Sequence, residues 1–187
     1  MKLVVASDIH GPTPGLQVLL SELGPMEILS PLDHESLAST SEQEAVAQFL
    51  ARGGIVEYGH RIAASVQGQP VMLVGFSVGA TSAWHYLASA QCHPDSIAVL
   101  YYGSRIRDAV QSVPRCQTHL IFAEYESSFN PIDLRAHFSS EQVEFILASG
   151  QHHGFMNPLH PRFDSAYAHQ QVTWLSELRR TYIETYP

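Results

Sequence analysis

Short apolar runs alternate with longer amphipathic segments along the 187-residue chain. The apolar runs have the length of buried β-strands and cover residues 2–6, 26–29, 71–74, 97–102, 119–123 and 143–147. Apolar residues recur at helical spacing between these runs, at residues 13–24, 41–67, 78–90, 130–138 and 163–182. This alternation predicts an α/β fold of about six mostly parallel strands with helices on both faces. We expect residues 1–187 to form one domain without a separate lid.

The second helical segment carries its own start and break signals. Ser41 and Glu44 have the spacing of a capping box, in which each side chain satisfies the backbone of the other. Gly53 and Gly54 then interrupt the apolar stripe, so we expect a break at this point.

The third apolar run ends in Gly75-Phe76-Ser77-Val78-Gly79, and an alanine-rich helical segment follows it. A Gly-x-Ser-x-Gly sequence between a strand and a helix is typical of a nucleophile elbow, a strained turn that exposes the serine hydroxyl. Gly75 and Gly79 lie at the positions where the crossing backbone leaves room only for hydrogen. We therefore predict that Ser77 is a nucleophile.

A nucleophilic serine needs a base to take its proton and a third group to orient that base. His153 follows the last predicted strand and precedes a glycine, so it is our candidate base, with His152 as the alternative. Glu126 follows the preceding strand and is our candidate acid, in competition with Glu124 and Asp133. The order serine, acid, histidine is that of α/β-hydrolases. Because the carboxyl ends of parallel strands meet at one edge, these residues should converge there.

The oxyanion formed during acyl transfer needs hydrogen-bond donors. We expect the backbone N–H groups of Val78 and Ile9 to supply them, since both lie directly beyond strand ends. Asp8 precedes Ile9, and we interpret it as a turn residue rather than a second carboxylate of the site.

Several residues near the reactive loops are candidates for substrate contact. Tyr102, Phe129 and Phe155 could line an apolar pocket, and an ordinary core position is an equally good interpretation of each. Arg105 could bind a substrate carboxylate, although a surface arginine is the more frequent case.

Composition narrows the class of ligand. The net charge is −8 and lysine and arginine do not cluster, which argues against nucleic-acid or membrane partners. Two distant cysteines and scattered histidines form no metal-binding pattern, so we expect no metal and no cofactor. The low cysteine content also fits a reducing cytoplasm, and no segment has the length of a membrane span.

Four segments together resemble the dienelactone hydrolase family: Gly75–Ala80, His153–Pro158, Tyr101–Gly103 and Asp8–Pro12. The resemblance spans nearly the whole chain. It implies an α/β-hydrolase core with its leading strands trimmed away. It also implies a nucleophile, base and acid at Ser77, His153 and Glu126, and oxyanion donors at Ile9 and Val78.

Two features depart from the family pattern. The name-giving enzymes use a cysteine nucleophile, whereas Ser77 is similar to the esterase-like members. Their acid is usually aspartate, and Glu126 is one methylene longer.

We therefore predict a serine hydrolase that cleaves a small ester or thioester through an acyl-enzyme. The alternatives are a hydrolase-fold binding protein or pseudoenzyme, and an acyltransferase or peptidase with the same residues. The sequence leaves a monomer and a dimer equally open. Activity should rise with pH as the histidine loses its proton.

Overall fold

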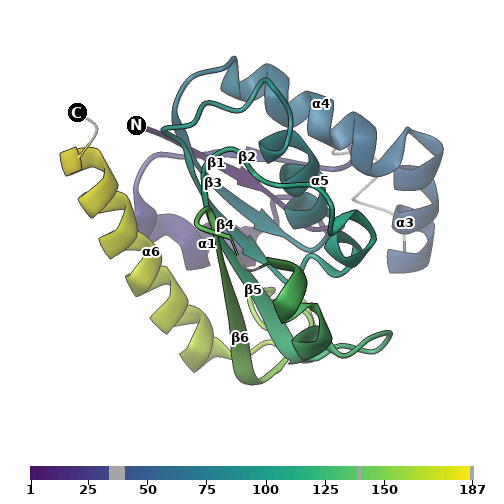
Figure 1. Ribbon diagram of the computed structural model, residues 1–187. Helices are drawn as coiled ribbons and strands as arrows, with labels where there is room; N and C mark the ends of the chain where they lie inside the picture. Colours follow the sequence, from purple (N-terminus) through teal and green to yellow (C-terminus); the bar gives the residue numbers. More distant parts are fainter. Residues whose placement is uncertain (34–40, 139, 186–187) are drawn as a thin grey trace.

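The computed structural model describes residues 1–33, 41–138 and 140–185. Its centre is a parallel sheet with strand order β2-β1-β3-β4-β5-β6 (Figure 1). The six strands, in chain order, are β1 (Lys2–Ala6), β2 (Glu27–Leu29), β3 (Val71–Phe76), β4 (Ile97–Tyr101), β5 (Gln117–Tyr125) and β6 (Val143–His152). The predicted α/β class is confirmed.

Helices cover both faces of this sheet. One face carries α3 (Glu42–Ala51), α4 (Gly54–Val66) and α5 (Val78–Leu87), and the other carries α1 (Pro14–Leu20) and the long α6 (Ser165–Thr185) (Figure 1). The short 3-10 helices are η1 (Ser21–Leu23), η2 (Ser104–Ala109) and η3 (Pro131–Phe138). No helix in the described part of the chain is long and apolar enough to cross a bilayer.

The alternation of strand side chains builds a separate core on each face of the sheet. On β1, Val4 points to the core under α3, α4 and α5, and Val5 points to the core under α1 and α6. All six residues of β3 are buried, as expected for a central strand covered on both sides.

The predicted helix signals are confirmed. Ser41 and Glu44 make the reciprocal hydrogen bonds of a capping box at the start of α3. The expected break falls at Gly53, whose left-handed backbone (φ 94°) separates α3 from α4.

The last two strands run further than the apolar pattern indicates. β5 continues past residue 123 to Tyr125, and β6 continues past residue 147 to His152. After a register shift between Ala123 and Tyr125, Tyr125 pairs with His152. Residues up to His152 therefore belong to β6, although the apolar pattern ends at residue 147. This extension sets where the residues after both strands lie.

Candidate active site

Ser77 occupies the tight turn between β3 and α5. Its φ of 50° and ψ of −112° are unusual for a non-glycine residue, and such strain costs about 1–3 kcal/mol. A Cβ on Gly75 would lie 2.7 Å from the Cα of Ala80, and one on Gly79 would lie 2.2 Å from the carbonyl oxygen of Ala6. Both glycines are therefore required, as predicted, and the turn presents the serine hydroxyl at the carboxyl edge of the sheet.

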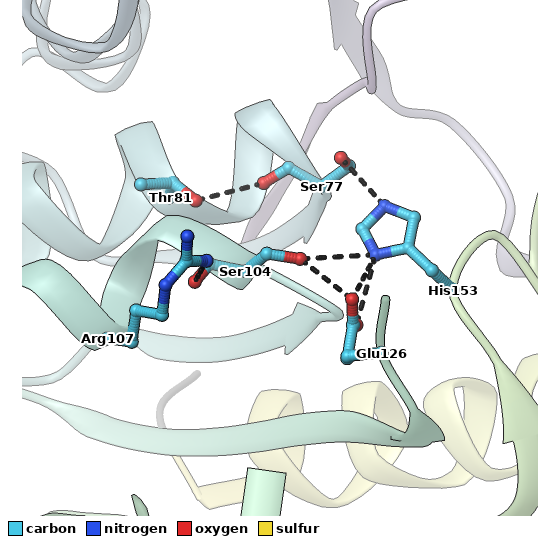
Figure 2. A network of polar contacts seen from close by, with 6 residues as sticks. All are labelled: Ser77, Thr81, Ser104, Arg107, Glu126 and His153. Carbon is cyan, nitrogen blue, oxygen red and sulfur yellow. Dashed lines mark hydrogen bonds and ion pairs between the residues drawn. The ribbon is translucent and has the colours of Figure 1, made fainter. Parts of the chain in front are cut away.

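Three side chains from distant parts of the sequence form a continuous row at this edge (Figure 2). The Ser77 hydroxyl lies 3.1 Å from Nε2 of His153. On the other side of the ring, Nδ1 of His153 lies 3.0 Å and 2.9 Å from the two carboxylate oxygens of Glu126. These are hydrogen-bond distances, and the arrangement is that of a nucleophile, a base and an orienting acid.

The environment of the ring assigns its proton. Nδ1 faces the Glu126 carboxylate, whose side chain is 3% exposed, so the proton of the neutral ring lies on Nδ1. The lone pair of Nε2 is then free to accept the proton of Ser77. The Tyr102 ring packs beside the imidazole with 4.9 Å between ring centres and limits its rotation.

Strand register explains why the acid and the histidine meet. Tyr125 and His152 are the last paired residues of β5 and β6, so Glu126 and His153 leave the sheet at the same level. Gly154 then turns the chain with φ 84°, and a Cβ there would lie 2.4 Å from the ring of His160.

The chain was compared with known proteins and with solved structures. No family model matches the chain. The chain is 29% identical over 179 residues to the uncharacterized protein YczH of Bacillus subtilis (strain 168), with 88% of this chain and 83% of that protein covered. A candidate dienelactone hydrolase of Klebsiella pneumoniae has a TM-score of 0.65 at 14% identity, over 95% of this chain and 84% of that chain.

Two further solved structures agree with the first. A candidate hydrolase of the alpha/beta superfamily from Xanthomonas campestris has a TM-score of 0.59 at 16% identity, covering 96% of this chain and 98% of that one. A cold-adapted esterase from an Arctic intertidal metagenomic library has a TM-score of 0.55 at 15% identity, covering 94% and 82%. The chain has the α/β-hydrolase fold. The resemblance drawn from the sequence is confirmed at the level of the fold.

In α/β-hydrolases the oxyanion donors come from the loops after two neighbouring strands. Here Val78 opens α5, and Ile9 lies in the pocket wall beside Ser77. Neither amide donates a hydrogen bond to another residue in the described part of the chain. Both N–H groups are therefore available to an oxygen bound at Ser77.

Asp8 fixes the loop that carries Ile9. One carboxylate oxygen accepts the backbone N–H of His10 at 3.0 Å, which is the expected turn. The other accepts the side-chain amide of Asn157 at 2.8 Å, which ties this loop to the histidine loop. Burial raises the pKa of Asp8, and these hydrogen bonds oppose the rise. Asp8 therefore forms the expected turn and also joins its loop to the loop that carries His153.

The competing candidates for the base and the acid lie away from the row. Glu124 accepts the backbone N–H of Gly150 at 2.6 Å and is partly exposed. Asp133 is bonded to Asn130 at 3.4 Å in the exposed start of η3. His152 packs against Tyr125 with 4.8 Å between ring centres. β6 ends at His152, and His153 is the first residue of the turn that follows, so the two side chains have different surroundings.

Of the predicted substrate contacts, Tyr102 lines the pocket at Ser77, whereas Phe129, Phe155 and Arg105 are not part of its lining. Phe155 is fully buried among aromatic core residues. Phe129 packs against Phe122 with 5.8 Å between ring centres. Arg105 points outward with a side chain that is 63% exposed and pairs with an aspartate in its own helix.

The pocket at Ser77 is small, with a volume of about 50 Å³, and most of its lining residues have polar side chains. Sequence reasoning missed His10, Glu42 and His160 in its wall. They come from the loop after β1, the first residue of α3 and the loop before α6, and only the fold brings them together. Burial lowers the pKa of His160, which favours its neutral form. No group of three ligands suited to a metal occurs among the described residues.

A larger cavity, of about 720 Å³, lies at the opposite end of the sheet. Its lining includes Gln67, Pro94 and Arg115, which precede β3, β4 and β5 respectively. Sites of open α/β sheets lie beyond the carboxyl ends of the strands. The small pocket at Ser77 is therefore the candidate active site.

Sequence reasoning also missed Ser104, the first residue of η2. Its hydroxyl donates to Glu126 at 3.0 Å and lies 3.2 Å from Nδ1 of His153 (Figure 2). The guanidinium of Arg107 donates to the backbone carbonyl of Ser104 at 2.6 Å. A serine that follows a strand carries no sequence signal of such a contact.

Proposed function

We propose that the protein is a serine hydrolase that cleaves small carboxylic esters or thioesters through an acyl-enzyme, in the manner of the dienelactone hydrolase family. The observation that carries this proposal is the hydrogen-bonded row of Ser77, His153 and Glu126 at the carboxyl edge of an α/β-hydrolase sheet. The small pocket beside Ser77 supports a short acyl group.

In the proposed mechanism each group has a step. His153 accepts the proton of Ser77 as the hydroxyl oxygen attacks the carbonyl carbon. The carbonyl oxygen becomes negatively charged and is bound by the N–H groups of Ile9 and Val78. As the tetrahedral intermediate collapses, the C–O or C–S bond breaks and His153 returns its proton to the leaving group. Water, deprotonated by the same ring, then attacks the acyl carbon. The bond to the Ser77 oxygen breaks, His153 returns the proton to that oxygen, and the carboxylic acid is released.

A covalent fluorophosphonate probe and short-chain p-nitrophenyl esters test this proposal together. The wild-type protein should be labelled at Ser77, and Ser77→Ala should lose labelling and about 10⁴-fold or more of its ester hydrolysis. Ser89→Ala is a matched control, since the Ser89 hydroxyl bonds to backbone groups of Tyr86 and Gln91 near the far end of α5, away from Ser77. Labelling that survives Ser77→Ala would place the nucleophile elsewhere.

Two further outcomes separate the alternatives. A wild-type protein that neither reacts with the probe nor hydrolyses any ester would favour a binding protein. Labelled protein that forms new esters with added alcohols faster than it forms the free acid would favour an acyltransferase.

A further inference from the structure

We propose that Ser104 is a positioning residue that holds the Glu126 carboxylate against His153. The inference rests on the proposed hydrolase function, because it assigns a role within the same row. Ser104 begins η2 directly beyond β4, the strand between those that carry Ser77 and Glu126. From this position its hydroxyl reaches both the Glu126 carboxylate and Nδ1 of His153 (Figure 2).

The first argument is the hydrogen-bond balance of Glu126. Its side chain is 3% exposed, and a buried carboxylate needs donors to remain charged. The donors within the described part of the chain are Nδ1 of His153 and the hydroxyl of Ser104. Removal of the serine would leave the buried charge with the imidazole alone.

The second argument is the length of the acid. A glutamate side chain has one more rotatable bond than aspartate, and its terminal torsion has no sharp minimum. Both Glu126 oxygens lie almost equally far from Nδ1, at 3.0 Å and 2.9 Å, so the imidazole alone does not fix the carboxylate plane. The Ser104 bond to one specific oxygen, at 3.0 Å, fixes it.

The third argument is that Ser104 is itself anchored. Arg107 donates to its carbonyl oxygen at 2.6 Å, and the same guanidinium lies 5.0 Å from the centre of the Phe129 ring. Phe129 belongs to the connection that follows Glu126. Arg107 thus joins the loop that carries the serine to the loop that carries the acid, which keeps the two at a fixed separation.

The test compares Ser104→Ala with Ser104→Thr, which retains the hydroxyl. Ser104→Ala should lower kcat for a short p-nitrophenyl ester by about 10-fold to 100-fold with little change in KM, since the bond supports charge formed during the reaction. Ser104→Thr should recover most of this loss. Ser112→Ala removes another half-buried serine from the same connection and serves as the control for folding.

A second measurement does not depend on turnover. The proton that His153 shares with Glu126 should give a strongly deshielded ¹H resonance, assigned by its loss in Glu126→Gln. Ser104→Ala should shift or broaden this resonance, and Ser112→Ala should leave it unchanged. An Ser104→Ala protein with the kcat and resonance of the wild type would overturn the positioning role. If the wild type hydrolyses no ester, the proposed function fails, and the resonance still decides the role of Ser104.

Discussion

The contact between α5 and β1 offers a sharp perturbation of the candidate site. Gly79→Ala would add a Cβ that meets the carbonyl oxygens of Ala6 at 2.2 Å and of Ser7 at 2.5 Å. These are backbone atoms of a central strand, so no side-chain rotation relieves the clash. Carbon–oxygen contacts in proteins are about 3.3 Å or longer, so α5 and β1 must separate by about 1 Å.

Separation of α5 from β1 would also move the two proposed oxyanion donors apart. Val78 precedes the substituted residue, and Ile9 lies three residues beyond Ala6. Overpacking of this kind costs about 1–3 kcal/mol, which lowers Tm by about 2–12 °C in a chain of this size. A misplacement of about 1 Å costs about 10²-fold in rate. We therefore expect Gly79→Ala to lose more activity than its loss of stability explains.

The assay measures thermal unfolding and ester hydrolysis on the same samples at a temperature where both variants are folded. Gly59→Ala is the matched control, because a Cβ in that helical position meets its nearest atom, the carbonyl oxygen of Ser82, at 3.4 Å. Helix propensity should make this control more stable by up to about 1 kcal/mol. A Gly79→Ala protein as stable and as active as the wild type would refute the close approach of α5 to β1.

Two further predictions follow from titratable groups. Asp164 accepts the N–H of Tyr167 at the start of α6, and this bond lowers the pKa of Asp164. Asp164→Ala should therefore cost about 1 kcal/mol in urea unfolding at neutral pH and less once the carboxylate is protonated at low pH; an equal cost at both pH values would contradict this. A hydrogen bond between the free thiols of Cys92 and Cys116 lowers the pKa of Cys92, which also lines the large cavity. The same hydrogen bond, together with burial, raises the pKa of Cys116. Iodoacetamide should therefore modify Cys92 before Cys116, as peptide mass spectrometry would show. Faster modification of Cys116 would contradict this prediction.

Local patterns were sufficient for the framework of the molecule. Six apolar runs gave the six strands, because a central parallel strand needs apolar side chains on both faces. The turn at Ser77 was recognisable because the close backbone approach at Gly75 and Gly79 leaves no room for a side chain. This local constraint requires glycine at both positions, so it is visible in the sequence. Residues that follow strand ends could then be assigned to one edge by topology alone.

Contacts between connections were not predictable in this way. Phe129 and Phe155 each follow a proposed catalytic residue by two or three positions in the sequence. Phe129 nevertheless packs against the guanidinium of Arg107, whereas Phe155 is fully buried in the core. Their directions depend on the path of each loop after its strand. Ser104, His10 and His160 reach the site by the same kind of path, and hydrophobic periodicity carries no information about it.

The lengths of β5 and β6 bear on why the proposed acid is a glutamate. β5 and β6 remain paired to Tyr125 and His152, so the acid and the histidine emerge side by side. The carboxylate must still reach beneath Nδ1 from the end of its own strand, and the extra methylene of Glu126 supplies this reach. The same methylene adds a torsion that has to be fixed, and the hydroxyl of Ser104 is placed to fix it. We therefore expect glutamate at 126 and a hydroxyl at 104 to depend on each other.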